Sequence, residues 1–269
     1  MFLRLLSIET RKTFKHPALW IGIGALVFLL ASIILAEQAQ VARSYQPANG
    51  GLGQDMLNAL SYFSWIGILI YAVTASVIAA FDYPDRSIQL WLTRGVPRSC
   101  LLLARLITIL FFGLLMVILA FTAILVLVGF SHLIFFGSVD ASDLNLAALL
   151  PAILRVFWGA LPYLALTMLL AVVSRSPLFA AGGTIIYGTV LEALLVRLDD
   201  MFPAIVRYLP AQLAQVLQIH NLRIYRLAPS LPIDATVMPE AQAVLAIGII
   251  FIVLSAISLV IFSRQDLGG

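Results

Sequence analysis

The chain has 269 residues, of which 62% are hydrophobic and only 11% are charged. A soluble domain carries about 25% charged residues because its surface faces water, so this composition excludes an ordinary soluble protein and indicates a bilayer environment. The net charge of +3 is small and no basic stripe with interleaved aromatic residues accompanies it, so we expect no nucleic-acid partner. Cys100 is the single cysteine, which excludes an internal disulfide and a cysteine-based metal cluster.

The first residues, Phe2–Lys15, predict an amphipathic helix. Arg4, Arg11 and Lys15 fall within about 40° of one another at 100° per residue. Apolar side chains lie broadly opposite them: Phe2, Leu3, Leu6 and Phe14. We expect such a helix to lie in the membrane interface against lipid headgroups until Pro17 ends it. The alternative is a basic flank that only fixes the topology.

Six later stretches are long and apolar enough to cross a bilayer, which takes roughly 20 residues. They cover residues 18–36, 60–81, 106–130, 149–173, 178–196 and 241–262. The first exceeds the apolar core of about 7–15 residues in a cleaved signal peptide, so we expect it to remain as a span. The prediction is an all-α polytopic membrane protein in which residues 1–269 form a single transmembrane domain.

Arginine and lysine predict the orientation because they are enriched in cytoplasmic loops. With the N-terminus in the cytoplasm, the inner segments hold ten of these residues and the outer segments hold five. Both termini are therefore predicted to be cytoplasmic.

The inner segment between the second and third spans predicts a short helix. Asp85–Leu92 follows Pro84 and precedes Gly95 and Pro97, which are typical start and stop signals. One side of this helix is apolar and suits docking into a groove of a partner protein; it carries Ile88, Trp91 and Leu92. The alternative is a helix that lies on the membrane surface.

The outer segment between the fifth and sixth spans is also partly apolar. Pro203 and Pro210 break Met201–Ile219 into pieces that are too short to cross the bilayer. We expect short helices that dip into the outer leaflet.

Catalytic motifs are absent from the sequence. A phosphate-binding loop needs a glycine-rich turn followed by a lysine, and neither lysine of this chain follows a glycine. The chain therefore cannot hydrolyse ATP through that motif. His16, His132 and His220 lie in separate regions without the spacing of metal ligands. We therefore expect no enzymatic activity, no cofactor and no metal in this chain.

Two ionisable residues fall inside predicted spans. Arg155 lies about 9 Å below the outer end of the fourth span, and Glu192 lies about 6 Å below that of the fifth. A charge in the bilayer centre costs at least roughly 2.5–3.5 kcal/mol on insertion scales. We predict that the two residues pair, which would cancel much of that cost. The alternative is that each side chain reaches the headgroups separately.

Three stretches carry a resemblance to a known family. The start reads I-E-T-R-K-T-F-K-H-P-A-L-W, similar to an "E-x-x-K" entry motif, and the end reads F-S-R-Q-D-L, similar to a closing aromatic, basic and aspartate pattern. The inner segment reads D-Y-P-D-R-S-I-Q-L-W-L-T-R-G-V-P-R-S-C-L-L-L-A-R-L. This segment is similar to a family pattern that begins with an acidic residue and a glycine-threonine step, which is replaced here by Arg86-Ser87. The pattern continues with leucines and "P-x-R" and ends with a basic residue that opens the next span. Over essentially its whole length the chain resembles the membrane subunit of a type-2 ABC exporter.

That resemblance implies a permease in the plasma membrane of a prokaryote. It would form the substrate path as a dimer with a second copy or a homologue, surrounded by membrane lipids. Separate cytoplasmic ATPase subunits would bind ATP and magnesium and would hold the coupling residues Asp85, Arg86, Ile88, Gln89, Trp91 and Leu92. Arg175, in the turn Ser174–Pro177, would be a minor contact, and Met201–Ile219 would be an outer re-entrant element.

Two alternatives to the exporter stay open. One is an autonomous secondary transporter or channel, although the inverted repeats typical of such proteins are not visible. The other is a non-transporting membrane assembly protein. No residue of the sequence selects the cargo.

Overall fold

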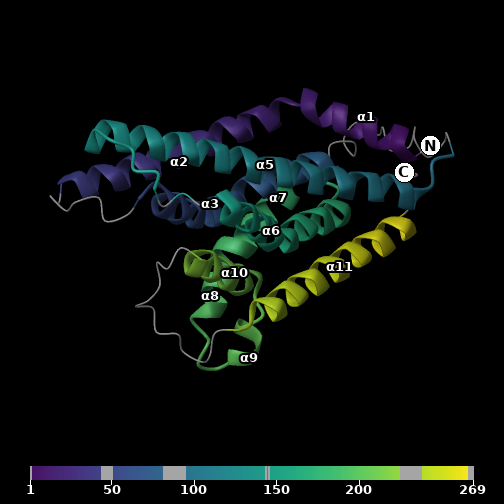
Figure 1. The fold of residues 1–269 in the computed structure, drawn as a ribbon. Helices are drawn as coiled ribbons and strands as arrows, with labels where there is room; N and C mark the ends of the chain where they lie inside the picture. The colour runs from purple at the N-terminus through teal and green to yellow at the C-terminus, as the bar shows by residue number, and fades with distance from the viewer. Residues whose placement is uncertain are drawn as a thin grey trace.

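The computed structural model describes residues 2–43, 51–80, 95–142, 144, 146–224 and 238–265. Every regular element in these residues is a helix, which confirms the predicted all-α class (Figure 1). In chain order the helices are α1 Phe2–Lys15, α2 Pro17–Arg43, α3 Leu52–Ala80, α5 Arg98–Phe136, α6 Leu146–Ser174, α7 Pro177–Ile186, the π-helical turn η1 Tyr187–Leu191, α8 Glu192–Val196, α9 Pro203–Val206, α10 Pro210–Ile224 and α11 Glu240–Arg264.

Five elements are long and apolar enough to cross a membrane: α2, α5, α6, α11 and the run from α7 to α8. α3 counts as a sixth candidate if its two parts, Leu52–Phe63 and Ile66–Ala80, which are bent by 51°, form one span. Each of the six predicted spans overlaps one of these elements. The predicted short helix Asp85–Leu92 lies outside the described residues.

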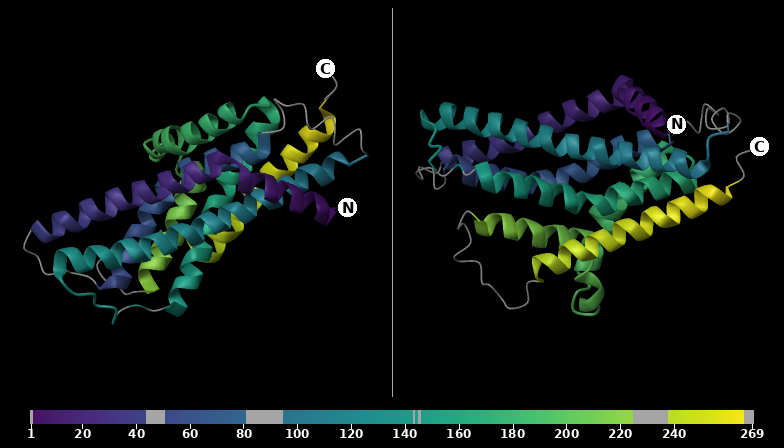
Figure 2. Two further views of the ribbon diagram at one scale, coloured as in Figure 1. Left: turned by 90° about the horizontal axis from the view of Figure 1, so that it is seen from above. Right: turned by 45° about the vertical axis from the view of Figure 1, so that its right-hand side comes forward.

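The helices form a layered bundle. α2 and α5 lie on one side, α10 and α11 lie on the opposite side, and α6 lies between them (Figures 1 and 2). The start of α1 and the end of α11 lie at the same end of the bundle (Figures 1 and 2).

Small residues allow the central helices to approach closely. A Cβ atom on Gly113 of α5 would lie 2.8 Å from Leu164 Cδ1 of α6. A Cβ atom on Gly183 of α7 would lie 2.8 Å from Leu170 Cδ1 of α6. Close helix packing through small residues is typical of membrane bundles, where burial from water drives little of the association.

Helix α1 has the predicted bounds, and its basic residues Arg4, Arg11 and Lys15 are exposed. Leu3, on the side predicted to face the membrane interface, is 77% exposed, whereas Leu5, Glu9 and Thr13 are buried against the protein. These three residues are spaced four apart and share one face, and α1 packs against α5. The prediction that α1 lies in the membrane interface stays a prediction, and the structure adds that Glu9 belongs to the side that packs against the protein.

The helices of the outer segment begin at the two prolines that were predicted to break it. Pro203 is the first residue of α9 and Pro210 is the first residue of α10. Proline suits this position because its missing N–H would have no partner within the helix. α10 has 15 residues and packs against α6 and α11.

Candidate functional site

Arg105 is the largest side chain buried in the bundle. It lies on α5 with 0% exposure, and its Nη1 donates a 3.0 Å hydrogen bond to the carbonyl oxygen of Ala79 in α3. Its Nε lies 4.0 Å from Oε1 of Glu9 in α1, which is itself only 3% exposed. Two stretches of the family resemblance, the "E-x-x-K" entry and the basic residue opening the third span, therefore meet in three dimensions.

A second arginine joins the ends of three helices. Arg98, the first residue of α5, donates from Nη1 to the carbonyl oxygens of Ser263 at 3.1 Å and Gln265 at 2.6 Å. The side-chain amide of Gln265 donates to the carbonyl oxygen of Val172 in α6 at 2.6 Å. The start of α5, the end of α6 and the end of α11 are thus held together.

These contacts make up what we call the basal network: Glu9, Ala79, Arg98, Arg105, Val172, Ser263 and Gln265. It joins the start of α5 to the end of α11, and these two helix ends lie at the end of the bundle where the termini are found (Figure 1). The network flanks residues 81–94, which are outside the described residues and contain the predicted coupling positions Asp85, Arg86, Ile88, Gln89, Trp91 and Leu92. The structure therefore places the two ends of the predicted coupling segment, and not the segment itself.

The other predicted contact, Arg175, lies on a tight turn beside the basal network. Its φ of +55° is left-handed, which is uncommon for a residue other than glycine. Ser176 then caps α7 by accepting a 3.4 Å hydrogen bond from the N–H of Phe179, and Pro177 starts the helix. The turn is short and hydrogen-bonded, so it presents Arg175 from a defined position.

The predicted pairing of Arg155 with Glu192 is wrong. Arg155 Nε donates to Oε1 of Glu240 at 2.6 Å, and its Nη1 donates to Oδ1 of Asn221 at 3.0 Å. The prediction compared depth alone, and depth does not fix which side of a helix a residue occupies. The partners of Arg155 come from α10 and α11, which lie on the side of α6 that it faces.

Glu192 has its own set of partners. It is 1% exposed, and its Oε2 accepts hydrogen bonds from the Tyr163 hydroxyl at 2.7 Å and from the N–H of Ala211 at 3.1 Å. Ala211 is in the first turn of α10, where free N–H groups and the helix dipole favour a carboxylate. We call these three residues the Glu192 anchor, because they fasten α10 to α6 and to the fifth span.

The π-helical turn η1 directly precedes Glu192. Such turns hold one residue more than an α-helical turn and occur frequently at functional sites. In η1, Gly188 lies so close to Tyr163 of α6 that a Cβ atom would be 3.1 Å from its Cε1. The turn therefore brings the fifth span against the tyrosine that holds Glu192.

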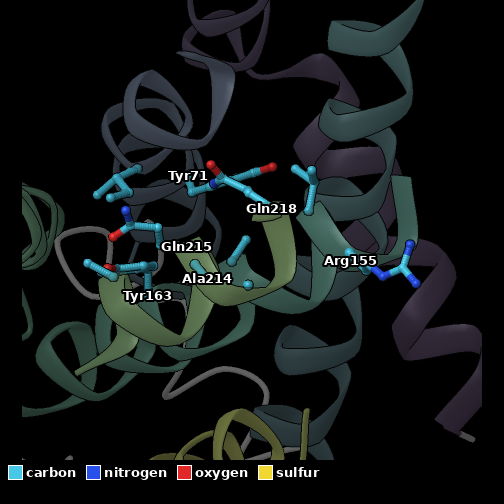
Figure 3. A pocket seen from close by; sticks show the side chains of 11 residues that line it. Tyr71, Arg155, Tyr163, Ala214, Gln215 and Gln218 are labelled. Atoms are coloured by element: carbon cyan, nitrogen blue, oxygen red, sulfur yellow. The ribbon is translucent and has the colours of Figure 1, made fainter. Parts of the chain in front are cut away.

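A pocket lies between α3, α6 and α10 and encloses about 40 Å³ (Figure 3). Its polar lining consists of Tyr71, Arg155, Tyr163, Gln215 and Gln218. Tyr71 is 2% exposed, and its hydroxyl has no hydrogen-bond partner within the part of the chain that the structure describes. In Figure 3, Arg155 lies apart from the other four labelled polar side chains. No sequence pattern marked Tyr71, since it is one aromatic residue within an apolar span.

A third polar cluster lies at the end of the bundle away from the termini. Oδ2 of Asp55 in α3 accepts from Nε2 of Gln38 in α2 at 2.8 Å and lies 2.8 Å from Nε2 of His132 in α5. His132 is thus part of a contact between α3 and α5. Among the described residues, no group of three or more His, Cys, Asp or Glu side chains could hold a metal ion.

Comparison with known proteins identifies the family. The family model described as ABC-2 family transporter protein matches residues 5–191, which is more than half of the chain. The match includes Glu9, Arg105 and the whole of segment 81–94, and it ends at the last residue of η1. A search of curated proteins finds no match. The chain, an all-helical protein with five to six candidate membrane spans, belongs to the ABC-2 family of transporter proteins.

Proposed function

We propose that the chain is the permease subunit of an ATP-driven exporter in a prokaryotic plasma membrane. Two permease subunits, identical or homologous, enclose the substrate path, and separate cytoplasmic ATPase subunits dock on Asp85–Leu92. The observation that carries this proposal is the basal network, because it ties both flanks of the docking segment to the rest of a bundle of the ABC-2 family.

The network suggests how movement at the docking segment reaches the spans. Movement of the end of α3 would displace Ala79, which is hydrogen-bonded to Arg105 of α5. Arg105 in turn contacts Glu9 of α1. Movement of the start of α5 would displace Arg98, which is hydrogen-bonded to the carbonyl oxygen of Gln265 at the end of α11. Gln265 in turn donates a hydrogen bond to Val172 of α6. Five helices are therefore linked at one end, so closure of the ATPase pair would tilt them together rather than bend one of them.

The division of labour in this proposal is the one that the family resemblance implies. ATP and magnesium bind to the partner, which supplies the hydrolysis, and the lack of a phosphate-binding loop in this sequence supports that assignment. The residues of this chain bind the partner, transmit its movement and line the path.

Affinity purification of the full chain from its native membranes tests the proposal. We expect a protein with a phosphate-binding loop to accompany it, and we expect vesicles with the cytoplasmic face outward to take up cargo only with ATP. The double variant Ile88→Asp and Trp91→Ala should lose this partner, because it removes the apolar side of the docking helix.

A matched double variant at the opposite face controls for general damage. Met201→Asp and Phe202→Ala change two exposed residues of the outer segment and should retain the ATPase. Transport without any ATP-hydrolysing partner, or a partner that stays bound to the Ile88 and Trp91 variant, would overturn the assignment.

A further inference from the structure

We propose that one side of α10 lines a water-filled cavity, which opens at the end of the bundle opposite the termini and extends close to the middle of the bilayer. We call this side the amide face, and it carries Gln212, Gln215 and Gln218. The inference deepens the proposed function and rests on it only in naming the cavity as the exit half of the substrate path.

Helix α10 lies against the first half of α6, well inside the bundle. A Cβ atom on Gly159 of α6 would lie 3.1 Å from the Cβ atom of Ala214 in α10. Gly159 comes ten residues after Leu149, where the candidate span of α6 begins, so it lies about 15 Å along that span. With 15 residues α10 is about 22 Å long, which is too short to cross roughly 30 Å of hydrocarbon.

Helix α11 gives a similar depth. A Cβ atom on its Gly248 would lie 3.8 Å from the side chain of Trp158, which directly precedes the glycine that α10 contacts. Gly248 comes eight residues after Glu240, the first residue of α11, and so lies about 12 Å along this candidate span. The two helices together place Gln215, the neighbour of Ala214, about 12–15 Å inside the bilayer.

The amide face is turned away from the protein at this depth. Gln215 is exposed, and Gln212 and Gln218 are half-buried. Leu213 and Leu217, on the other side of α10, are only 0% and 1% exposed. Residues three apart are neighbours on a helix surface, so the three amides form one continuous side. Gln215 and Gln218 also line the pocket between α3, α6 and α10 (Figure 3).

Lipid is a poor solvent for these side chains. An amide has two N–H donors and a carbonyl acceptor, and hydrocarbon offers none of them a partner. Polar side chains at membrane depth therefore face protein or a water-filled cavity. The exposed residues of α11 at this depth are all apolar and are between 49% and 67% exposed: Leu245, Ile249, Ile252 and Val253. This contrast assigns lipid to α11 and water to the amide face.

Cysteine labelling of the full chain tests the cavity. Cys100, the single cysteine, is first replaced by serine, and Gln215→Cys or Gln218→Cys is then introduced. A charged, membrane-impermeant maleimide is added to sealed membrane vesicles of each orientation. We expect labelling only when the reagent faces the end of the bundle opposite the termini. The rate should exceed that of a lipid-exposed cysteine by at least about ten-fold, because the thiolate reacts and apolar surroundings disfavour it.

Ile249→Cys is the matched control. Ile249 is 61% exposed and lies nine residues into α11, about 14 Å along the span, so it differs from Gln215 in its surroundings and not in its depth. This variant should stay unlabelled from both sides. The melting temperature of each variant is compared with that of Cys100→Ser, and Gln212→Cys replaces either glutamine variant that fails to fold.

The labelling needs neither ATP nor a partner, so its outcome does not depend on whether an ATPase accompanies the chain. The link to the path is tested separately, in vesicles that show ATP-driven uptake. A maleimide adduct formed on Gln215→Cys before the vesicles are prepared should stop this uptake, while maleimide treatment of Ile249→Cys should leave it unchanged. Full uptake through the labelled Gln215→Cys variant would show that the cavity is not the path.

Three labelling results would overturn the cavity itself. One is a rate for Gln215→Cys and Gln218→Cys as slow as that for Ile249→Cys, which would mean that lipid or protein covers the amide face. Another is a disulfide between two chains of Gln215→Cys without any reaction with the maleimide, which would make a second copy the cover. The third is labelling from the side of the termini alone, which would place the opening at the wrong end.

Discussion

The basal network and the Glu192 anchor each bury an ionisable side chain, but the partners of that side chain differ in kind. Arg105 has an opposite charge, Glu9, as well as a backbone carbonyl. Glu192 has neutral donors, the Tyr163 hydroxyl and the Ala211 N–H. The first arrangement depends on charge, whereas the second depends on hydrogen-bond donors in the right places. Substitutions that keep shape but remove charge should therefore separate the two regions.

The largest effect is expected at the basal network. Arg105→Met leaves Glu9 buried without the guanidinium, and removing one partner of a buried pair costs about 3–5 kcal/mol. Thermal unfolding of the purified chain measures this loss. Adding Glu9→Gln to Arg105→Met should recover part of it, since no lone charge then remains. If the double variant is no more stable than Arg105→Met, the two residues do not depend on each other.

The Glu192 anchor should respond to shape and hydrogen bonding more than to charge. Glu192→Leu leaves the Tyr163 hydroxyl and the Ala211 N–H without an acceptor, and orphaned groups cost about 1–3 kcal/mol each. Glu192→Gln keeps a carbonyl oxygen and should cost much less. The same unfolding measurement compares the two variants. Equal destabilisation by both would mean that the charge itself holds α10.

The smallest effect is expected at Arg155. Its side chain is 18% exposed and that of Glu240 is 36% exposed, whereas those of Arg105 and Glu9 are 0% and 4% exposed. Because protein atoms enclose the Arg155 pair less completely, Arg155→Met should lower the melting temperature less than Arg105→Met does. A loss as large as that of Arg105→Met would place Arg155 in a more buried setting than its exposure indicates.

The sequence predicted the features that depend on length, composition and local turn chemistry. The apolar runs located the spans because each must match the bilayer thickness. Pro203 and Pro210 located the starts of α9 and α10, since proline ends one helix and suits the first position of another. The bounds of α1 also followed from a local pattern.

The partners of the buried polar groups could not be predicted in this way. Arg155 meets Glu240, which lies 85 positions away in the sequence, and the choice depends on where α10 and α11 pack. A uniform helical wheel also misplaces Glu192, because η1 adds a residue to the turn before it. Hydropathy fixes how deep a residue lies, but the direction it faces is a property of the assembled bundle.

The extra residue in η1 has a consequence for how the fifth span can change in length. Deleting one residue between Tyr187 and Leu191 would allow an uninterrupted α-helix, which is the simpler local structure. Because a π-helical turn takes up one residue more in about the same rotation, the parts of the span before and after the deletion would keep nearly the same facing. Glu192 should then stay directed at Tyr163 and Ala211, so a deletion here should be tolerated, whereas a deletion elsewhere in the span before Glu192 would turn this side chain by about 100°.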